Sequence, residues 1–528
     1  MRLCFPQGLV LSLAIMAGST GLPALHAQSS VGHRSQTITL PIQEHILDNG
    51  LRVLVLHRPG DARVAAKIFT RMGALNEVPG ELGAAHFLEH LMFKGTPTLG
   101  TTDWEAEGPV RERMWEVEAE LIEEWNRARN LLRQRGVFHD YRHAESTPRL
   151  DSLRTELEAL EREARAYRDH GVMMRWYQAF GGTRLTATTE QEYMKFDINL
   201  PVERVEVFFR LESDRMVNSI FREFDEERMI LVEQRFGDLN RPLTPYFEAL
   251  NASAGRIHPV FWPEGYLPDF NQYTRHYEEE LYREFFVPNN TALVLVGGVT
   301  LEEMVPLAEK YFGWMERRPE PNRVKATEPL PEAERRLIWR TAESPPRVEV
   351  RYLVPGVGHP DRPHFDVLGE LALEAVQAAL RGLGITARVG SNFRVIHTER
   401  FGVPATWNLE VELADEGHLE RAEQAVLATL EELATAPPAA VELDRIRERL
   451  RTDWYRLARN ADALAFEIGL FFTMDRWQTL EEYLNAREAT SRDDLHRLVT
   501  RYLVPENRTV GIIRSPEPPI LPLPESAR

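Results

Sequence analysis

The segment Gly83–Thr96, GAAHFLEHLMFKGT, places two histidines four residues apart and a glutamate beside the second. On an α-helix, residues four apart project from the same side, so His86 and His90 can bind one metal ion. The carboxylate of Glu89 would then lie beside the ion without binding it, which is where a general base for a metal-held water must be. His-x-x-Glu-His therefore predicts a catalytic metal centre on a helix.

A catalytic zinc site takes three protein ligands and leaves one position for water. The best source of a third ligand is the segment 224–236, FDEERMILVEQRF. Glu226 and Glu233 are two helical turns apart there and share one face. The pattern is equally compatible with a structural role, in which these glutamates form salt bridges with Arg228 or Arg235.

Three apolar residues of this segment are expected to bury its neighbouring faces: Met229, Ile230 and Val232. A glutamate that projects from a mostly apolar helix needs a partner, because an unpaired buried carboxylate is costly.

The N-terminus is typical of an export signal. Arg2 is followed by an apolar run, Gly8–Ala17, and then by small and polar residues up to Ala27. We therefore expect a signal peptide over residues 1–27 and a periplasmic or secreted protein. An uncleaved anchor or a cytoplasmic N-terminal helix is the alternative. No later segment is long and apolar enough to span a membrane.

Composition limits the cofactors and the partners. The only cysteine lies within the expected signal peptide, so the mature chain must hold any metal with His, Asp or Glu. The formal net charge of −18 argues against nucleic acid as a partner, because phosphate backbones favour clustered Lys and Arg.

A repeat organises the rest of the chain. Leu281–Val299, LYREFFVPNNTALVLVGGV, is similar to Leu498–Pro516, LVTRYLVPENRTVGIIRSP, and Pro288 and Pro505 stand at matching places. Each copy reads as the end of a helix, a turn and a strand. We therefore predict an α+β fold of two similar domains, each an α/β sandwich with a mostly antiparallel sheet. The expected ranges are residues 36–316, 346–516, a linker 317–345 and a tail 517–528.

The first domain contains a charged insert over residues 103–170. Two apolar stripes at helical spacing predict a helical hairpin: Val110, Met114, Val117 and Leu121, then Leu150, Leu153, Leu157 and Leu160. Such stripes are packing surfaces, and we assign them no chemistry.

Several motifs together resemble one family. HFLEH with MFKGT, the opening LDNGLRVLV, Gly73–Glu77 (GALNE) and EERMILVE are similar to the pitrilysin/insulinase family of inverted zinc peptidases. The resemblance implies a zinc metalloendopeptidase with His86, His90 and Glu233 as zinc ligands. It also implies that Glu89 is the base on the zinc-bound water and that Glu226 supports the site from behind the ligands.

The resemblance also implies where a peptide substrate lies. It places an extended peptide along a sheet edge at residues 181–188, where Thr186 stands at a position that is Asn in many members. In LRGLGITAR, Arg381 and Arg388 stand where active members have an Arg and a Tyr that grip the substrate. Two solvent-exposed arginines without such a role are the alternative.

One chain of this size resembles half of a clamshell chamber, so we expect a homodimer or a heterodimer with a metal-free homologue. Two functions from other classes stay open. The first is a non-catalytic peptide-binding or assembly subunit of the same fold. The second is a zinc hydrolase that acts on a non-peptide amide.

Overall fold

The computed structural model describes residues 37–136, 147–257, 265–321, 328–329, 331–395, 404–435 and 438–516. The expected signal peptide, 1–27, and the expected tail, 517–528, lie outside the described residues. In the part of the chain that is described, no helix is long and apolar enough to cross a membrane.

The first half of the chain forms a six-stranded sheet in the order β1-β2-β6-β3-β5-β4. Its strands are β1 Ile42–Ile46, β2 Arg52–His57, β3 Arg63–Thr70, β4 Thr183–Thr189, β5 Met194–Pro201 and β6 Thr291–Gly297. β2 and β6 are parallel, and every other pair is antiparallel. The turn Asp48-Asn49-Gly50 joins β1 to β2, and Gly50 adopts the positive φ of 92° that such turns require.

The second half repeats this arrangement in five strands, in the order β7-β11-β8-β10-β9. They are β7 Arg335–Arg340, β8 Arg347–Val354, β9 Ala387–Val395, β10 Ala405–Leu413 and β11 Arg508–Arg514. β7 is parallel to β11, as β2 is to β6, and the remaining pairs are antiparallel. The predicted fold of two similar, mostly antiparallel sheets with helices packed on them is confirmed.

The expected linker, 317–345, contains a strand. Strand β7 lies within it and pairs with β11 along its whole length. The Pro- and Glu-rich composition concealed this strand, which alternates partly buried Arg335, Leu337 and Trp339 with exposed residues.

The two sequence repeats have the same structure. Helix α9 (Arg275–Phe285) leads through a short 3-10 turn into β6, and helix α16 (Arg492–Tyr502) leads likewise into β11. The Asn290 side-chain amide donates to the carbonyl oxygens of Arg71 (3.2 Å) and Phe285 (2.9 Å). Its counterpart Asn507 donates to Leu353 (2.7 Å) and Tyr502 (2.8 Å). Asn290 therefore joins the end of α9 to the residue that follows β3, and Asn507 joins the end of α16 to β8.

The other helices of the first half are α1 Ala84–Leu91, α2 Trp104–Gln134, α3 Pro148–Ala164, α4 Val172–Ala179, α5 Glu206–Asn218, α6 Phe224–Leu239, α7 Thr244–Ala254, α8 Leu267–Phe270 and α10 Leu301–Phe312. Those of the second half are α11 His364–Gly382, α12 Leu419–Thr435, α13 Ala440–Ala458, α14 Ala461–Met474 and α15 Gln478–Glu488.

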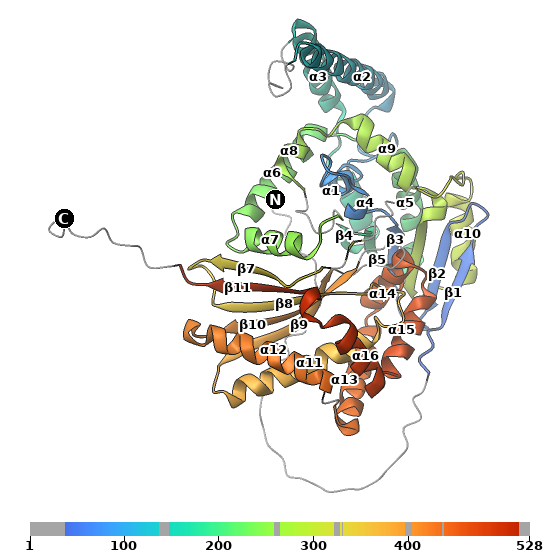
Figure 1. The fold of residues 1–528 in the computed structure, drawn as a ribbon. Helices are drawn as coiled ribbons and strands as arrows, with labels where there is room; N and C mark the ends of the chain where they lie inside the picture. The colour runs from blue at the N-terminus through green and yellow to red at the C-terminus, as the bar shows by residue number, and fades with distance from the viewer. Residues whose placement is uncertain are drawn as a thin grey trace, which may run out of the picture.

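The halves exchange covering helices (Figure 1). α14, from the second half, packs on β3 and β6 of the first sheet, and α15 packs beside α14 in the same apolar cluster. α7, from the first half, packs on β7 and β11 of the second sheet through Tyr246 and Leu250. Each sheet is thus covered on one face by its own half and on the other by its neighbour.

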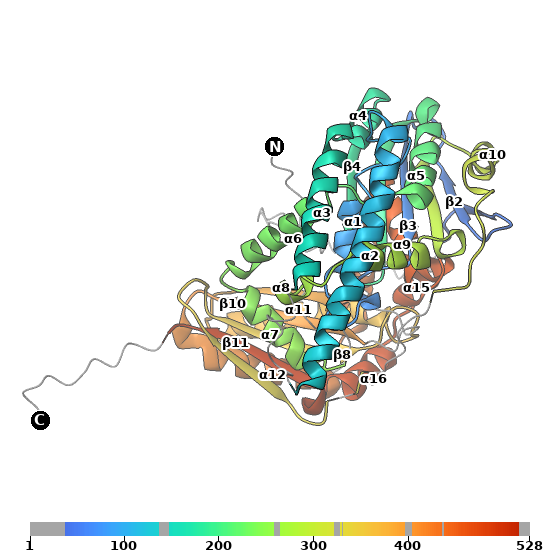
Figure 2. The same cartoon turned by 90° about the horizontal axis from the view of Figure 1, so that it is seen from above.

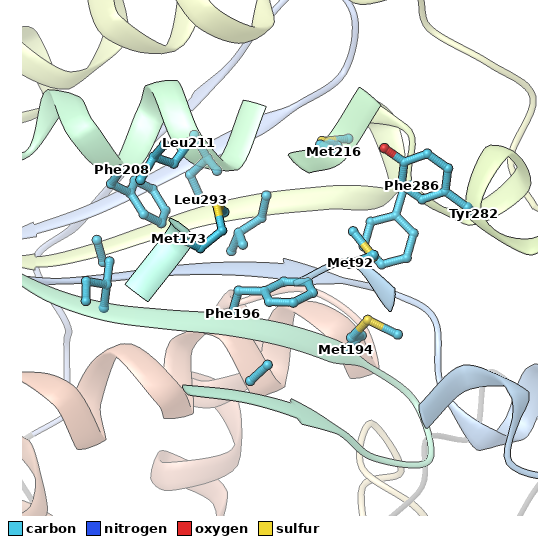
Figure 3. Packing of buried hydrophobic residues seen from close by; sticks show 14 of the residues in the cluster. Met92, Met173, Met194, Phe196, Phe208, Leu211, Met216, Tyr282, Phe286 and Leu293 are labelled. Carbon is cyan, nitrogen blue, oxygen red and sulfur yellow. The ribbon is translucent and has the colours of Figure 1, made fainter. Parts of the chain in front are cut away.

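The predicted helical hairpin is present. α2 and α3 run side by side above both sheets in the view of Figure 1, and Figure 2 shows their full length lying across the molecule. Thr147 caps α3 by accepting the Leu150 amide N–H at 3.1 Å, as its position before Pro148 predicts. The first half's own core includes Met92, directly after α1, with Phe208 of α5, Phe196 of β5 and Leu293 of β6 (Figure 3).

Candidate metal centre and peptide-binding edge

Helix α1 begins where another segment approaches the backbone closely. Gly83 has φ 97°, and a Cβ there would lie 2.8 Å from the Cα atom of Gly265. The Glu77 carboxylate accepts the backbone N–H groups of Gly83 (2.8 Å) and Ala85 (2.9 Å). A buried carboxylate at the helix N-terminus satisfies N–H groups that have no partner within the helix. Glu77 thus fixes the start of α1, a role that sequence reasoning did not assign.

α1 brings its two histidines together. The ring centroids of His86 and His90 are 4.8 Å apart, with the planes at 84°. Burial and the neighbouring His90 lower the pKa of His86 to about 3, so its imidazole is neutral. A neutral imidazole is the form that binds a metal. The predicted pairing of the histidines on one helical side is therefore present.

Glu89 is 4 % exposed and lies beside the pair. Its Oε2 accepts a hydrogen bond from the Thr189 hydroxyl at 2.7 Å. Burial raises the pKa of Glu89, although the Thr189 hydrogen bond and the charges of His90 and Lys195 oppose the rise. Thr189 was not among the predicted residues, because nothing in its sequence context indicates the contact.

His90 is held from α6 by Glu227. The distance from His90 Nδ1 to Glu227 Oε2 is 2.8 Å, and Lys94, from the MFKGT segment, contacts the other oxygen. Burial acts to raise the pKa of Glu227, but these two hydrogen bonds outweigh it and keep the pKa below its usual value. An ionised carboxylate only accepts, so Nδ1 carries the proton and Nε2 keeps the lone pair that a metal needs.

Glu226, which we expected to support the site from behind the ligands, contacts two arginines instead of His86 or His90. Its Oε1 pairs with Arg165 (2.7 Å) and Arg168 (3.0 Å), at the exit of the helical hairpin. The adjacent Glu227 faces His90 instead, because the helix is rotated by one residue from the expected register. Two apolar residues that we expected to be buried follow the same rotation, since Met229 is 54 % exposed and Ile230 39 %.

Glu233, the expected third ligand, is exposed to solvent. The alternative was a salt bridge from Glu226 or Glu233 to Arg228 or Arg235. These two arginines have other partners, because Arg228 pairs with Asp225 (2.5 Å) and Arg235 with Glu248 (2.5 Å). In the described ranges, no three His, Cys, Asp or Glu side chains are grouped closely enough to hold a metal ion. The residues present therefore provide two positions of a zinc site and no carboxylate for the third.

Strand β4 is the last strand of its sheet and passes beside α1. It includes the half-buried Thr186 and most of the expected substrate edge, 181–188. The strand has a bulge between Thr183 and Thr186, where Arg184 adopts φ 61° and pairs with Asp462 of α14 at 3.2 Å. The edge is therefore held by both halves of the chain.

Arg381 and Arg388 are both exposed. Arg381 lies in the last turn of α11, and Arg388 on β9 pairs with Glu412 of β10 at 3.0 Å. A role for either in substrate binding stays a prediction.

Comparisons with known proteins agree with this fold. Residues 52–106 match the insulinase model (peptidase family M16), and residues 279–450 match the peptidase M16 inactive domain. This chain carries domains of peptidase family M16. The M16 resemblance inferred from its motifs is confirmed.

The zinc protease PqqE of Helicobacter pylori is 21% identical over 507 residues, covering 93% of this M16 chain and 95% of the relative. Other curated zinc proteases match over short stretches, in one case 52 residues or 13% of the relative. A crystal structure of a protease from Helicobacter pylori superposes with a TM-score of 0.69 at 18% identity, covering 90% of this chain and 100% of that one. The periplasmic protease PqqL from Escherichia coli gives 0.66 at 14% identity. That match covers 91% of this chain and 48% of PqqL, so the chain spans about half its length.

Proposed function

We propose that this M16 chain is an exported zinc endopeptidase that binds peptides in extended form along β4 and hydrolyses them at α1. One observation carries the proposal. The hydrogen bond between Thr189 and Glu89 joins the terminal strand to the candidate base at 2.7 Å. A peptide that adds to this sheet edge by backbone hydrogen bonds would pass directly beside the carboxylate.

Each side chain of the site has its own role in this proposal. His86 and His90 would hold zinc, which supplies a polarised water for attack on the peptide carbonyl. Glu89 accepts the proton at Oε1, the oxygen that Thr189 does not bind, and returns it to the leaving amine. Glu227 keeps the His90 ring oriented with Nε2 toward the centre.

A second function is favoured by a specific observation. Among the described residues no third His, Cys, Asp or Glu completes the histidine pair. A chain that binds peptide along β4 without cleaving it, as a subunit of a larger peptidase, is compatible with this incomplete set of ligands.

One experiment separates these functions. The mature chain, beginning at Gln28, is incubated with a mixed peptide pool in excess zinc, and Glu89→Gln is the matched control. We expect cleavage by the unmodified chain and none by the variant, because the amide cannot accept the proton. Equal cleavage by both would exclude Glu89 as the base. Peptide binding by both with cleavage by neither would support the second function.

The partner is also part of the proposal. Because the chain spans 48% of PqqL, we propose that it works as one half of a chamber. Sedimentation of the mature chain should give the mass of two chains, or peptide cleavage should appear only after a homologous second subunit is added. Full activity in a monomer would contradict this part of the proposal.

A further inference from the structure

We infer that Gln234 occupies the third position of this metal centre, so that a neutral amide stands where a zinc site needs a carboxylate. The inference rests on the proposed metal-binding role of the histidine pair, and it does not depend on peptide hydrolysis.

The orientation of α6 is fixed by one contact. Glu227 reaches His90 at 2.8 Å, so the direction of its side chain marks the helix face that is turned toward α1. Each residue rotates the direction by about 100°, so the residue seven positions later returns to within about 20° of it. That residue is Gln234. Glu233 lies about 120° away, on a different face.

The exposure of the side chains agrees with this orientation. The buried residues of α6 are Phe224, Glu227, Leu231 and Arg235. The exposed residues of α6 are Met229, Ile230, Glu233, Phe236 and Gly237. Gln234 is half-buried, between these two groups. It therefore lies at the border between the buried and the exposed faces of α6.

The spacing of the expected site leads to the same residue. The resemblance implied a supporting glutamate and a ligand seven residues apart, which we placed at Glu226 and Glu233. The structure gives the supporting contact to Glu227, one residue later. The same two-turn spacing then ends at Gln234, and the chain has no carboxylate at that place.

This exchange changes the chemistry of the centre. A glutamate would bring a negative charge to Zn²⁺, whereas the Gln234 amide offers only a neutral carbonyl oxygen. Zinc takes its protein ligands from Cys, His, Asp and Glu. We therefore expect weak zinc binding by this chain.

The test is a zinc titration of the mature chain against a chromophoric chelator, with no peptide present. Gln234→Glu should bind zinc at least about tenfold more tightly than the unmodified chain, a conservative expectation given that changes outside the ligand set alter metal affinity by about 10–100-fold. Glu233→Gln is the matched control, since it changes charge by one unit at the neighbouring position. It should leave the affinity within about twofold. Far-UV circular dichroism checks that each variant is folded.

Two results would overturn the inference. One is a loss of zinc affinity in Glu233→Gln, and the other is an unchanged affinity in Gln234→Glu. The proposed function is tested separately by the peptide pool. Tight zinc binding by Gln234→Glu without cleavage by either protein would support the inference and contradict hydrolysis. Conversely, the unmodified chain could cleave peptides in a zinc-dependent way and lose this activity in Glu233→Gln. That result would support hydrolysis and contradict the inference.

Discussion

Neighbouring residues of α6 have different roles because a helix turns by about 100° at each step. Glu227 is ionised and holds His90 through Nδ1, whereas Glu226 is turned toward Arg165 and Arg168 of the hairpin exit. The same rotation separates Gln234 from Glu233. At this scale, the chemistry of the centre depends on which of two adjacent side chains faces α1.

Replacing Glu227 should weaken metal binding without removing a ligand. In Glu227→Gln the charged acceptor for His90 Nδ1 is lost, and a loss of this kind lowers metal affinity by about 10–100-fold. The zinc titration measures it. Glu226→Gln removes the same charge one residue away and should bind zinc like the unmodified chain. Equal losses of zinc affinity in both variants would show that the affinity depends on the net charge of this region and not on the contact with His90.

A buried carboxyl group on α9 should lower the stability of the protein at neutral pH. Glu278 is fully buried, neither of its oxygens has a hydrogen-bond partner, and burial with the nearby charges of Glu77 and Glu81 raises its pKa well above 4.5. The folded state therefore holds this proton more tightly than the unfolded state. Stability is lost as the pH rises above about 4.5, the ordinary value, toward the raised pKa.

Glu278→Gln should thus be more stable than the unmodified chain at pH 8, by about 1–3 kcal/mol, and the difference should disappear near pH 4. Urea unfolding at the two pH values measures it. The exposed Glu280→Gln is the control and should change little at either pH. A Glu278→Gln variant that is less stable at pH 8 would contradict the argument.

At the scale of elements, the two halves are built from the same unit. In each, a helix, a 3-10 turn and a parallel-paired strand are joined by one buried asparagine, Asn290 or Asn507. The side-chain amide donates hydrogen bonds to backbone carbonyl groups of both segments, and two carbonyl groups cannot bond to each other. This local requirement explains why the Val-Pro and Asn of the repeat stand at matching places.

Asn290→Ala and Asn507→Ala should each destabilise the fold. Each variant leaves two carbonyl groups without their donor, and an unsatisfied buried polar group costs about 1–3 kcal/mol. Chemical denaturation measures the loss. Asn240→Ala, at the exposed end of α6, should stay within about 0.5 kcal/mol of the unmodified chain. A small effect at Asn290 or Asn507 would exclude the proposed joining role.

At the scale of the whole molecule, the exchange of helices makes the halves interdependent. Lys67 of β3, 2 % exposed, pairs with Asp462 of α14 at 2.9 Å, and Gly469 of α14 packs against the Phe69 ring. The edge strand β4 is tied to α14 through Arg184 and the same Asp462. We therefore expect the halves to unfold in one transition.

Gly469→Ala tests this coupling. A Cβ at Gly469 would lie 2.0 Å from a ring carbon of Phe69, so the helix must shift, at a cost of about 1–3 kcal/mol. Calorimetry should show one transition at a lower temperature. Gly237→Ala, in α6 with nothing within 4 Å of its Cβ, should be neutral or stabilising. Two separate transitions in Gly469→Ala would contradict a single cooperative unit.

The sequence by itself determined the features that depend on local spacing. The pairing of His86 with His90 follows from the pitch of a helix. The apolar stripes predict the helical hairpin, and the repeat predicts two similar units. The rotation of α6 was decided only by tertiary packing. Its polar Glu227 and Arg235 are buried because their partners, His90, Lys94 and Glu248, come from other helices, while apolar Met229 and Ile230 face solvent. Apolar periodicity cannot reveal such partners, so it could not show which faces of α6 are buried.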